Sequence, residues 1–315
     1  MPCRSRPLSA VLAIIVMTTV ASCSSDATTS VTDVSTTVTA TTVSTSVTAS
    51  DVDDTHLPVG DQQYADTPTR GAVMACRTQN GAAGAQAAGP WFNSDGTWDL
   101  TNKVFVQGEV RWDDASASFA VEGDQRVISS NGLPVGAITG VFPVAADDPA
   151  AAYDRNPNSI TSQTLSFRVP AVPVMASTAT CVGGEVGVAI NGIPIFNAFD
   201  AGGRDAGAWE VQDTCQGHPQ GQGLYHYHSI SDCLDTPGVN PSPLVGYAFD
   251  GFGIYGSRDA SGNQIHDSDL DECHGITSEV VWDGQTVTMY HYVATHEFPY
   301  TVGCFRGTAT AVAGG

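Results

Sequence analysis

Three histidines with the potential to bind a metal ion lie close together in the sequence: His218, His226 and His228. His226 and His228 alternate with Tyr225 and Tyr227, as residues of a β-strand often do. Residues two apart in a strand point to the same side, so we expect these two imidazoles on one face, about 6–7 Å apart along the strand. His218 precedes them across a glycine-rich loop. Because imidazole suits zinc and copper, the segment predicts a transition-metal site.

A second segment, Met289–Val293, repeats the alternation of histidine with tyrosine. We expect His291 to lie beside the first strand, as a fourth ligand or as an acid–base group facing a substrate. The alternation also suits any well-formed strand, so a structural role is the alternative. Further side chains are candidates for orienting the ligands or transferring protons: Asp250, Tyr225, Tyr227, Asp271, Glu272 and His274.

A metal with an open coordination position would activate water or support redox chemistry, with the tyrosines as proton or electron donors. The sequence favours neither a hydrolase nor an oxidase, and it leaves open whether the protein is an enzyme. The alternative is a non-catalytic surface module. In that case the histidines form hydrogen bonds inside the fold, and an acidic face binds calcium, a glycan or a protein partner.

Two other patterns resemble ligand-binding loops. The segment Gly251–Gly256 fits G-x-G-x-x-G, but turn-forming residues follow it where a dinucleotide site needs a helix, so we predict no nucleotide cofactor. The acidic run Asp259–Glu272 lacks the glycine and glutamate positions of an EF-hand. It is compatible with an irregular calcium site, and a solvated acidic loop is the alternative.

The composition excludes some classes of partner. The formal net charge is -21, with 12 Lys and Arg against 33 Asp and Glu, so no binding to nucleic acid is expected. Cations are the more natural partners. The 33 Gly and 17 Pro disfavour long helices, and strands joined by turns should dominate.

The N-terminus has the order of an export signal. Arg4 and Arg6 precede an apolar run, Leu8–Met17, that is shorter than the about 20 residues of a membrane-spanning helix. The residues Val20–Cys23 resemble the bacterial lipobox, which implies a lipoprotein signal peptide over residues 1–22 and lipidation of Cys23. The expected location is therefore the extracytoplasmic face of the cell membrane, with a lipid anchor. Ordinary secretion is the alternative.

Composition also indicates where the folded domain begins and ends. A tract rich in Ser and Thr follows Cys23, and it cannot bury a core, so residues 23–61 are predicted to be a flexible linker. We expect one folded domain over residues 62–307. The small residues at 308–315 predict a disordered tail.

Six cysteines lie in the predicted domain, and in an exported protein they imply three disulfides. The sequence does not select strictly among the pairings. Two pairs are favoured because each brackets a strand-like segment. The two cysteines that remain would then form the third disulfide. The favoured pairs are Cys215 with Cys233, Cys273 with Cys304, and Cys76 with Cys181.

Short strand-like segments recur along the domain, and no long amphipathic helix is evident. The clearest signal is a hairpin over Glu279–Thr295, where Asp283-Gly284 suits a tight turn with positive φ. We predict an all-β, disulfide-braced single domain that resembles an antiparallel β-sandwich, with few or no helices. The other predicted strands are Lys103–Trp112, Ser116–Val121, Leu165–Val169, Val182–Ile190, Leu224–His228 and Val245–Phe249.

The tetrapeptide Tyr225–His228 and several other stretches resemble the YHYH-domain family of exported bacterial proteins. The resemblance covers roughly Trp91–Gly307 and implies an extracytoplasmic location, but no particular reaction. Members often repeat the tetrapeptide near the C-terminus, whereas Val293 ends the second copy here, so the resemblance leaves His291 as its one ligand. The supporting stretches are Gly140–Pro143, Tyr153–Ser159, Asn191–Pro194, Gly203–Ala206, Gly246–Gly256, Leu270–Gly275 and Phe298–Cys304.

Overall fold

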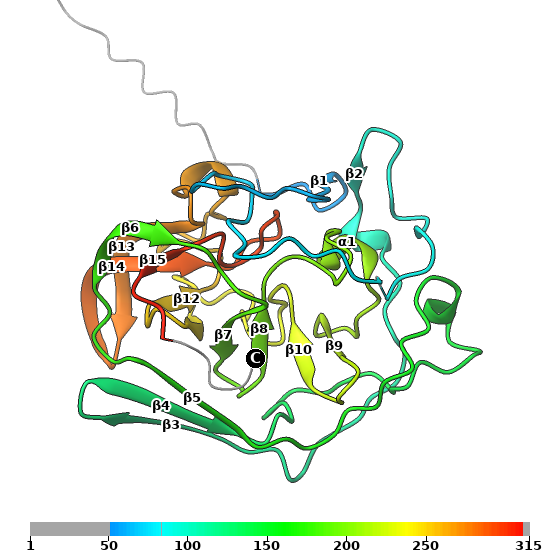
Figure 1. Cartoon of the computed structure of the whole chain (residues 1–315), viewed down its shortest axis with the longest axis horizontal. Helices are drawn as coiled ribbons and strands as arrows, with labels where there is room; N and C mark the ends of the chain where they lie inside the picture. Colours follow the sequence, from blue (N-terminus) through cyan, green and yellow to red (C-terminus); the bar gives the residue numbers. More distant parts are fainter. Residues whose placement is uncertain (1–50, 83, 311–315) are drawn as a thin grey trace, which may run out of the picture. The chain divides into compact units, whose positions relative to one another are not determined.

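The computed structural model describes residues 51–82 and 84–310 (Figure 1). Strands dominate these residues, and the α-helix among them is α1 (Ala206–Trp209). Single 3-10 turns form η1 (Leu100–Asn102), η2 (Pro149–Ala152) and η3 (Asp267–Asp269). The predicted signal peptide, the lipidation site Cys23 and most of the predicted linker and tail lie outside the described residues.

An eight-stranded sheet forms the centre of the fold. The strands in spatial order are β13 (Gly275–Trp282), β14 (Gln285–Val293), β12 (Gly253–Tyr255), β11 (Leu244–Ala248), β7 (Glu185–Ala189), β8 (Pro194–Phe196), β10 (Tyr225–Tyr227) and β9 (Gly217–Pro219). The all-β prediction is confirmed. The sheet is mixed, because β8 pairs in parallel with β10, and β12 with β14, while the other neighbours are antiparallel. In each case a crossover connection through another strand returns the chain in the same direction.

Three smaller sheets complete the architecture: β1 (Leu57–Pro58) with β2 (Thr97–Trp98), β6 (Met175–Thr180) with β15 (Phe305–Gly307), and β3 (Ala117–Glu122), β4 (Gln125–Ser130) and β5 (Leu165–Pro170). The three-stranded sheet packs on the central sheet. The ring of Phe119 lies 5.8 Å from that of Tyr247, and Phe167 stacks on Phe249 at 5.6 Å. These contacts give the sandwich-like packing that the sequence predicts.

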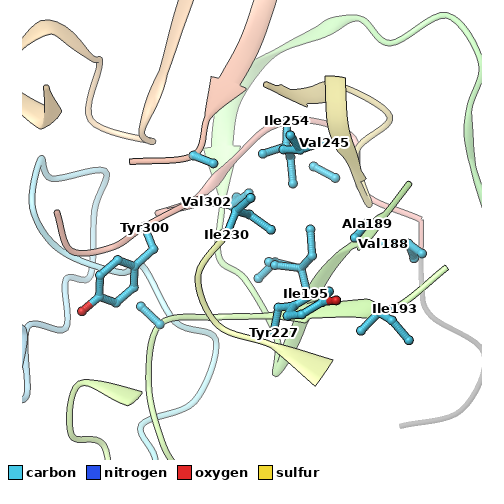
Figure 2. Close-up of a cluster of buried hydrophobic side chains, with 14 of the residues drawn as sticks. Val188, Ala189, Ile193, Ile195, Tyr227, Ile230, Val245, Ile254, Tyr300 and Val302 are labelled. Atoms are coloured by element: carbon cyan, nitrogen blue, oxygen red, sulfur yellow. The ribbon is translucent and has the colours of Figure 1, made fainter. Parts of the chain in front are cut away.

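The core lies around the middle strands of the central sheet. Val188, Ile195, Val245, Ile254 and Tyr227 are fully buried, and they lie together in Figure 2. The runs Val186–Ala189 and Val245–Ala248 are buried at consecutive positions. Strands covered on both faces favour such continuous apolar runs over strict alternation.

The local predictions were mostly correct. The hairpin forms as β13 and β14, and Asp283 and Gly284 have φ of 48° and 78°. The strand predicted over Lys103–Trp112 is wrong, since only Val110 in it forms a single bridge, with Thr139. In its place, the buried Lys103 side chain donates to the carbonyl oxygen of Gly207 and to the side chain of Gln212, which ties this segment to α1 and to the loop after it.

The three disulfides join Cys76 to Cys181, Cys215 to Cys233 and Cys273 to Cys304, the pairs that the spacing favours. They indicate an oxidising, extracytoplasmic compartment. No helix in residues 51–82 or 84–310 has the length and apolar character to cross a lipid bilayer. The fold also begins earlier than Gln62. Leu57 is buried and pairs with Trp98, which corrects the predicted end of the linker.

Candidate metal centre

The three histidines of the first segment meet at one edge of the central sheet. β9 and β10 are antiparallel neighbours, and their register places His218 directly opposite His226. His228 follows β10 on the same face as His226. All three side chains are buried, with relative exposures of 3–4%. One ligand nitrogen from each lies within 4.8 Å of the others, so the rings converge as the sequence predicts.

Asp213 fixes the turn that leads into β9. Its carboxylate accepts hydrogen bonds from the backbone N–H groups of Cys215, Gly217 and Gly140 and from the hydroxyl of Tyr225. The disulfide of Cys215 then ties the turn to the segment after β10. These contacts hold His218 opposite His226 even though β9 is only three residues long.

The proton positions on two of the histidines follow from their neighbours. Nδ1 of His228 lies 2.6 Å from the carbonyl oxygen of Asn197, and Nδ1 of His226 lies 3.2 Å from that of Leu224. A carbonyl oxygen only accepts hydrogen bonds, so each Nδ1 carries the proton. Each neutral ring is then left with a lone pair on Nε2.

The two lone pairs face each other, because the Nε2 atoms of His226 and His228 lie 3.1 Å apart. Burial lowers the pKa of His228 to about 4 and the pKa of His226 well below its ordinary value, so neither ring has a second proton at neutral pH. Two acceptors at this distance repel each other unless a cation lies between them. Tetrahedral coordination with bonds of ~2.0–2.1 Å places ligand nitrogens roughly 3.4 Å apart, close to the observed separation.

Glu210 supplies a carboxylate to the same point. Its Oε2 lies 3.3 Å from Nε2 of His218 and 3.4 Å from Nε2 of His228. This oxygen and both ring nitrogens of His218 are buried without a hydrogen-bond partner. Burial, followed by the nearby carboxylates of Asp200 and Asp154, raises the pKa of Glu210 to about 8. Buried polar atoms without partners are costly, and a shared cation would satisfy the Glu210 oxygen and Nε2 of His218.

A cavity of about 430 Å³ opens onto the three histidines and Glu210. Its other walls carry amides, two carboxylates and the rings of Phe196 and Phe199, and among residues 51–82 and 84–310 no lysine or arginine lines it. The ring of Phe196 lies 4.1 Å from that of His226 and limits the space on that side of the cluster. The group therefore lies at the wall of a pocket large enough for a small molecule.

Residues 166–267 match the model of the YHYH protein family. The chain contains a YHYH domain. The match includes β7 to β12 together with His218, His226, His228 and Glu210, and so it covers the whole histidine cluster. No curated protein and no solved structure matches the chain.

His291 does not join the cluster of the YHYH domain. It lies on β14, which is separated from β10 by β12, β11, β7 and β8, roughly 24 Å across the sheet. Its Nδ1 lies 3.2 Å from the carbonyl oxygen of Met289, and its ring contacts Tyr255. We expected the segment Met289–Val293 to pair beside the strand that carries His226. That expectation is wrong, because β14 pairs with β12 instead.

The predicted partners of the histidines have other roles. Asp250 contacts no imidazole: it is fully buried and accepts from the hydroxyl of Tyr292 at 2.6 Å and from backbone N–H groups. Tyr225 donates to Asp213, and Tyr227 accepts from Asn191, both on the face opposite the histidines. Burial raises the pKa of both tyrosines above the ordinary value, so they remain protonated.

The acidic segment after Asp259 also lies apart from the cluster. Asp271 accepts from Tyr290 and from backbone N–H groups, Glu272 is exposed, and His274 lies between Asp267 and Thr295. The carboxylate of Asp259 closes its own loop. Within the described residues, the histidine cluster is the one place where three or more potential metal ligands converge. The acidic side chains therefore do not support the predicted calcium site.

Glu210 was missed by the sequence analysis. It lies in the irregular stretch after α1, where no periodicity indicates its direction, and the helix is only four residues long. The proximity of Glu210 to the histidine segment was the one signal available, and Asp205 and Asp213 share it.

Proposed function

We propose that the protein is an extracytoplasmic metal-binding protein that holds one transition-metal ion, zinc or copper, through His218, His226 and His228. Glu210 completes the ligand set or balances the charge of the ion. The observation that carries this proposal is the pair of Nε2 lone pairs facing each other at 3.1 Å, with both Nδ1 protons committed to carbonyl oxygens. A ring buried for packing alone would avoid this arrangement.

The pocket beside the cluster supports a role beyond holding the fold together. Structural zinc sites are closed, whereas sites that act on molecules keep a position open to a cavity. A metal bound here would act as a Lewis acid or redox centre toward a ligand in the pocket. Asp154 and Asp200 lie on the pocket wall, and Arg204 pairs with Asp200 from outside it, while no lysine or arginine of the described residues lines the pocket. These charges favour a small neutral or cationic molecule over an anionic one.

The metal content of the mature domain, purified without a polyhistidine tag, tests the proposal. We expect about one zinc or copper ion per chain by elemental analysis, retained through dialysis against a weak chelator. Metal-free protein that also fails to take up added zinc or copper would contradict it. That result would favour the non-catalytic surface module with structural histidines.

We also propose that Cys23 anchors the protein to the membrane by a lipid, with the serine- and threonine-rich segment as a spacer. The lipobox-like residues Val20–Cys23 and the oxidising compartment implied by the disulfides support this. Mass spectrometry of the mature N-terminus is expected to show a diacylglyceryl-modified Cys23. An unmodified N-terminus at another residue would show ordinary secretion.

A further inference from the structure

The central sheet consists of two runs of four strands in the same order. From the middle outward, one run is β7, β8, β10 and β9, and the other is β11, β12, β14 and β13. In both runs the first pair is antiparallel, the second parallel and the third antiparallel. The chain visits the strands of each run in the same sequence.

The residue pairing repeats as well. In the first pair, Gly187 lies opposite Ile195, and Gly246 lies opposite Ile254. Each of these pairs has an irregularity just before the glycine. In the second pair, Ile195 aligns with Tyr227 and Ile254 with Tyr292; in the third, His218 faces His226 and Ile276 faces His291.

The two runs meet in a symmetric contact. β7 and β11 are antiparallel, and Val188 of one lies opposite Tyr247 of the other. These two residues are counterparts, since each follows the glycine of its own run. On either side, Gly187 pairs with Ala248, and Ala189 with Gly246. A contact in which counterparts exchange places is the pattern of two equal units related by a two-fold axis.

The buried polar contacts repeat too. Asp213 and Asp271 each begin a segment Asp-x-Cys-x-Gly, and each accepts from the N–H of that cysteine and that glycine and from a tyrosine hydroxyl. The residues between cysteine and glycine, Gln216 and His274, both have positive φ. Such agreement in register, side-chain chemistry and backbone conformation is not required by a generic mixed sheet.

His226 and His291 are counterparts in this scheme. In each, Nδ1 lies 3.2 Å from the carbonyl oxygen two residues earlier, and an aromatic ring packs against the imidazole, Phe196 in one unit and Tyr255 in the other. Ile276 occupies the position of His218, and Val293 that of His228. The second unit thus keeps one ligand position of three.

We propose that the central sheet is a duplicated four-stranded unit, and that its second unit retains the framework of a second metal site from which Ile276 and Val293 have displaced two histidine ligands. This inference rests on the proposed function for the nature of the site. It assigns the second unit a structural role in the present protein. It also implies that His291 binds no metal only because the two neighbouring ligand positions are occupied by Ile276 and Val293.

The variant Ile276→His with Val293→His tests the inference. Elemental analysis is expected to show metal content rising from about one to about two ions per chain. In a chain that also carries His226→Ala and His228→Ala, about one ion should remain. The control adds two histidines at exposed positions outside the Ile276–His291 pair, Val121→His with Val281→His, and should leave the metal content unchanged.

A folded double variant with unchanged metal content would overturn the inference while leaving the proposed function intact. Wild-type protein without metal, together with a variant that gains about one ion, would contradict the proposed function and support the duplicated framework. Val293 is fully buried, so the double variant can fail to fold. In that case Ile276→His alone, which faces His291 across the strand pair, must raise the midpoint of thermal unfolding on addition of zinc or copper. No metal-dependent rise in that variant would overturn the inference.

Discussion

Replacing His226 and His228 together by alanine is expected to abolish tight metal binding, with a loss of affinity of at least about a thousandfold. The change removes two of the three imidazoles that converge within 4.8 Å and leaves His218 with Glu210. Removing a ligand-orienting group alone typically costs 10–100-fold, so the loss of two ligands should cost much more. Competition with a chromogenic chelator measures the affinity of each variant.

Two variants set the scale of this effect. His291→Ala removes a histidine that is equally buried and has the same bond to a backbone carbonyl, but lies across the sheet, so metal affinity should not change. Glu210→Gln keeps the three imidazoles and should weaken metal binding by about 10–100-fold. Equal losses of metal affinity in His291→Ala and in the variant that lacks both His226 and His228 would indicate that metal binding depends only on the stability of the fold. That result would contradict the assigned site.

Replacing Asp213 by alanine is expected to lower the free energy of unfolding by about 4 kcal/mol or more. Its buried carboxylate accepts from Cys215, Gly217, Gly140 and Tyr225, and alanine leaves these donors unpaired in the core. Each buried donor without a partner costs about 1–3 kcal/mol. Urea unfolding with the disulfides intact measures the change.

Asp259→Ala is the matched control. Asp259 also accepts from several groups, the backbone N–H of Ser261 and of Asn263 and the Asn263 amide, but it is only half-buried in a surface loop, where water replaces it. Its loss should cost less than about 1 kcal/mol. Similar effects in the two variants would show that burial of the Asp213 network does not contribute as we infer.

Much of the site was readable because its signal is local. His226 and His228 share a face of a three-residue strand, and this follows from the two-residue period of β structure. His218 was found because a short loop connects it to that strand. The disulfide pairs followed from strand-like segments between the cysteines. The Asp283-Gly284 turn needed only the conformational preference of its own two residues.

The misplaced residues depend on which strands become neighbours. His291 has the sequence context of a ligand, yet β12 pairs with β14 and keeps it from β10. Asp250 follows a buried strand. Only the packing of β14 and β15 decides that the Tyr292 hydroxyl and the backbone N–H of Arg306 donate hydrogen bonds to its carboxylate. Glu210 reaches the histidines because contacts with distant segments hold the stretch between α1 and β9, as the hydrogen bond from the N–H of Val106 to the carbonyl oxygen of Gln212 does.

The sequence by itself determined the strand-rich class and the grouping of the three imidazoles, since both rest on residues near one another in the chain and on backbone geometry. It favoured the cystine pairs without determining them. The tertiary structure alone decided that Glu210 joins the imidazoles, that His291 does not, and that two four-stranded units meet about Val188 and Tyr247. The physical reason is that strand order in a sheet is fixed by the burial of both faces at once. That burial is a property of the whole chain and of no single segment.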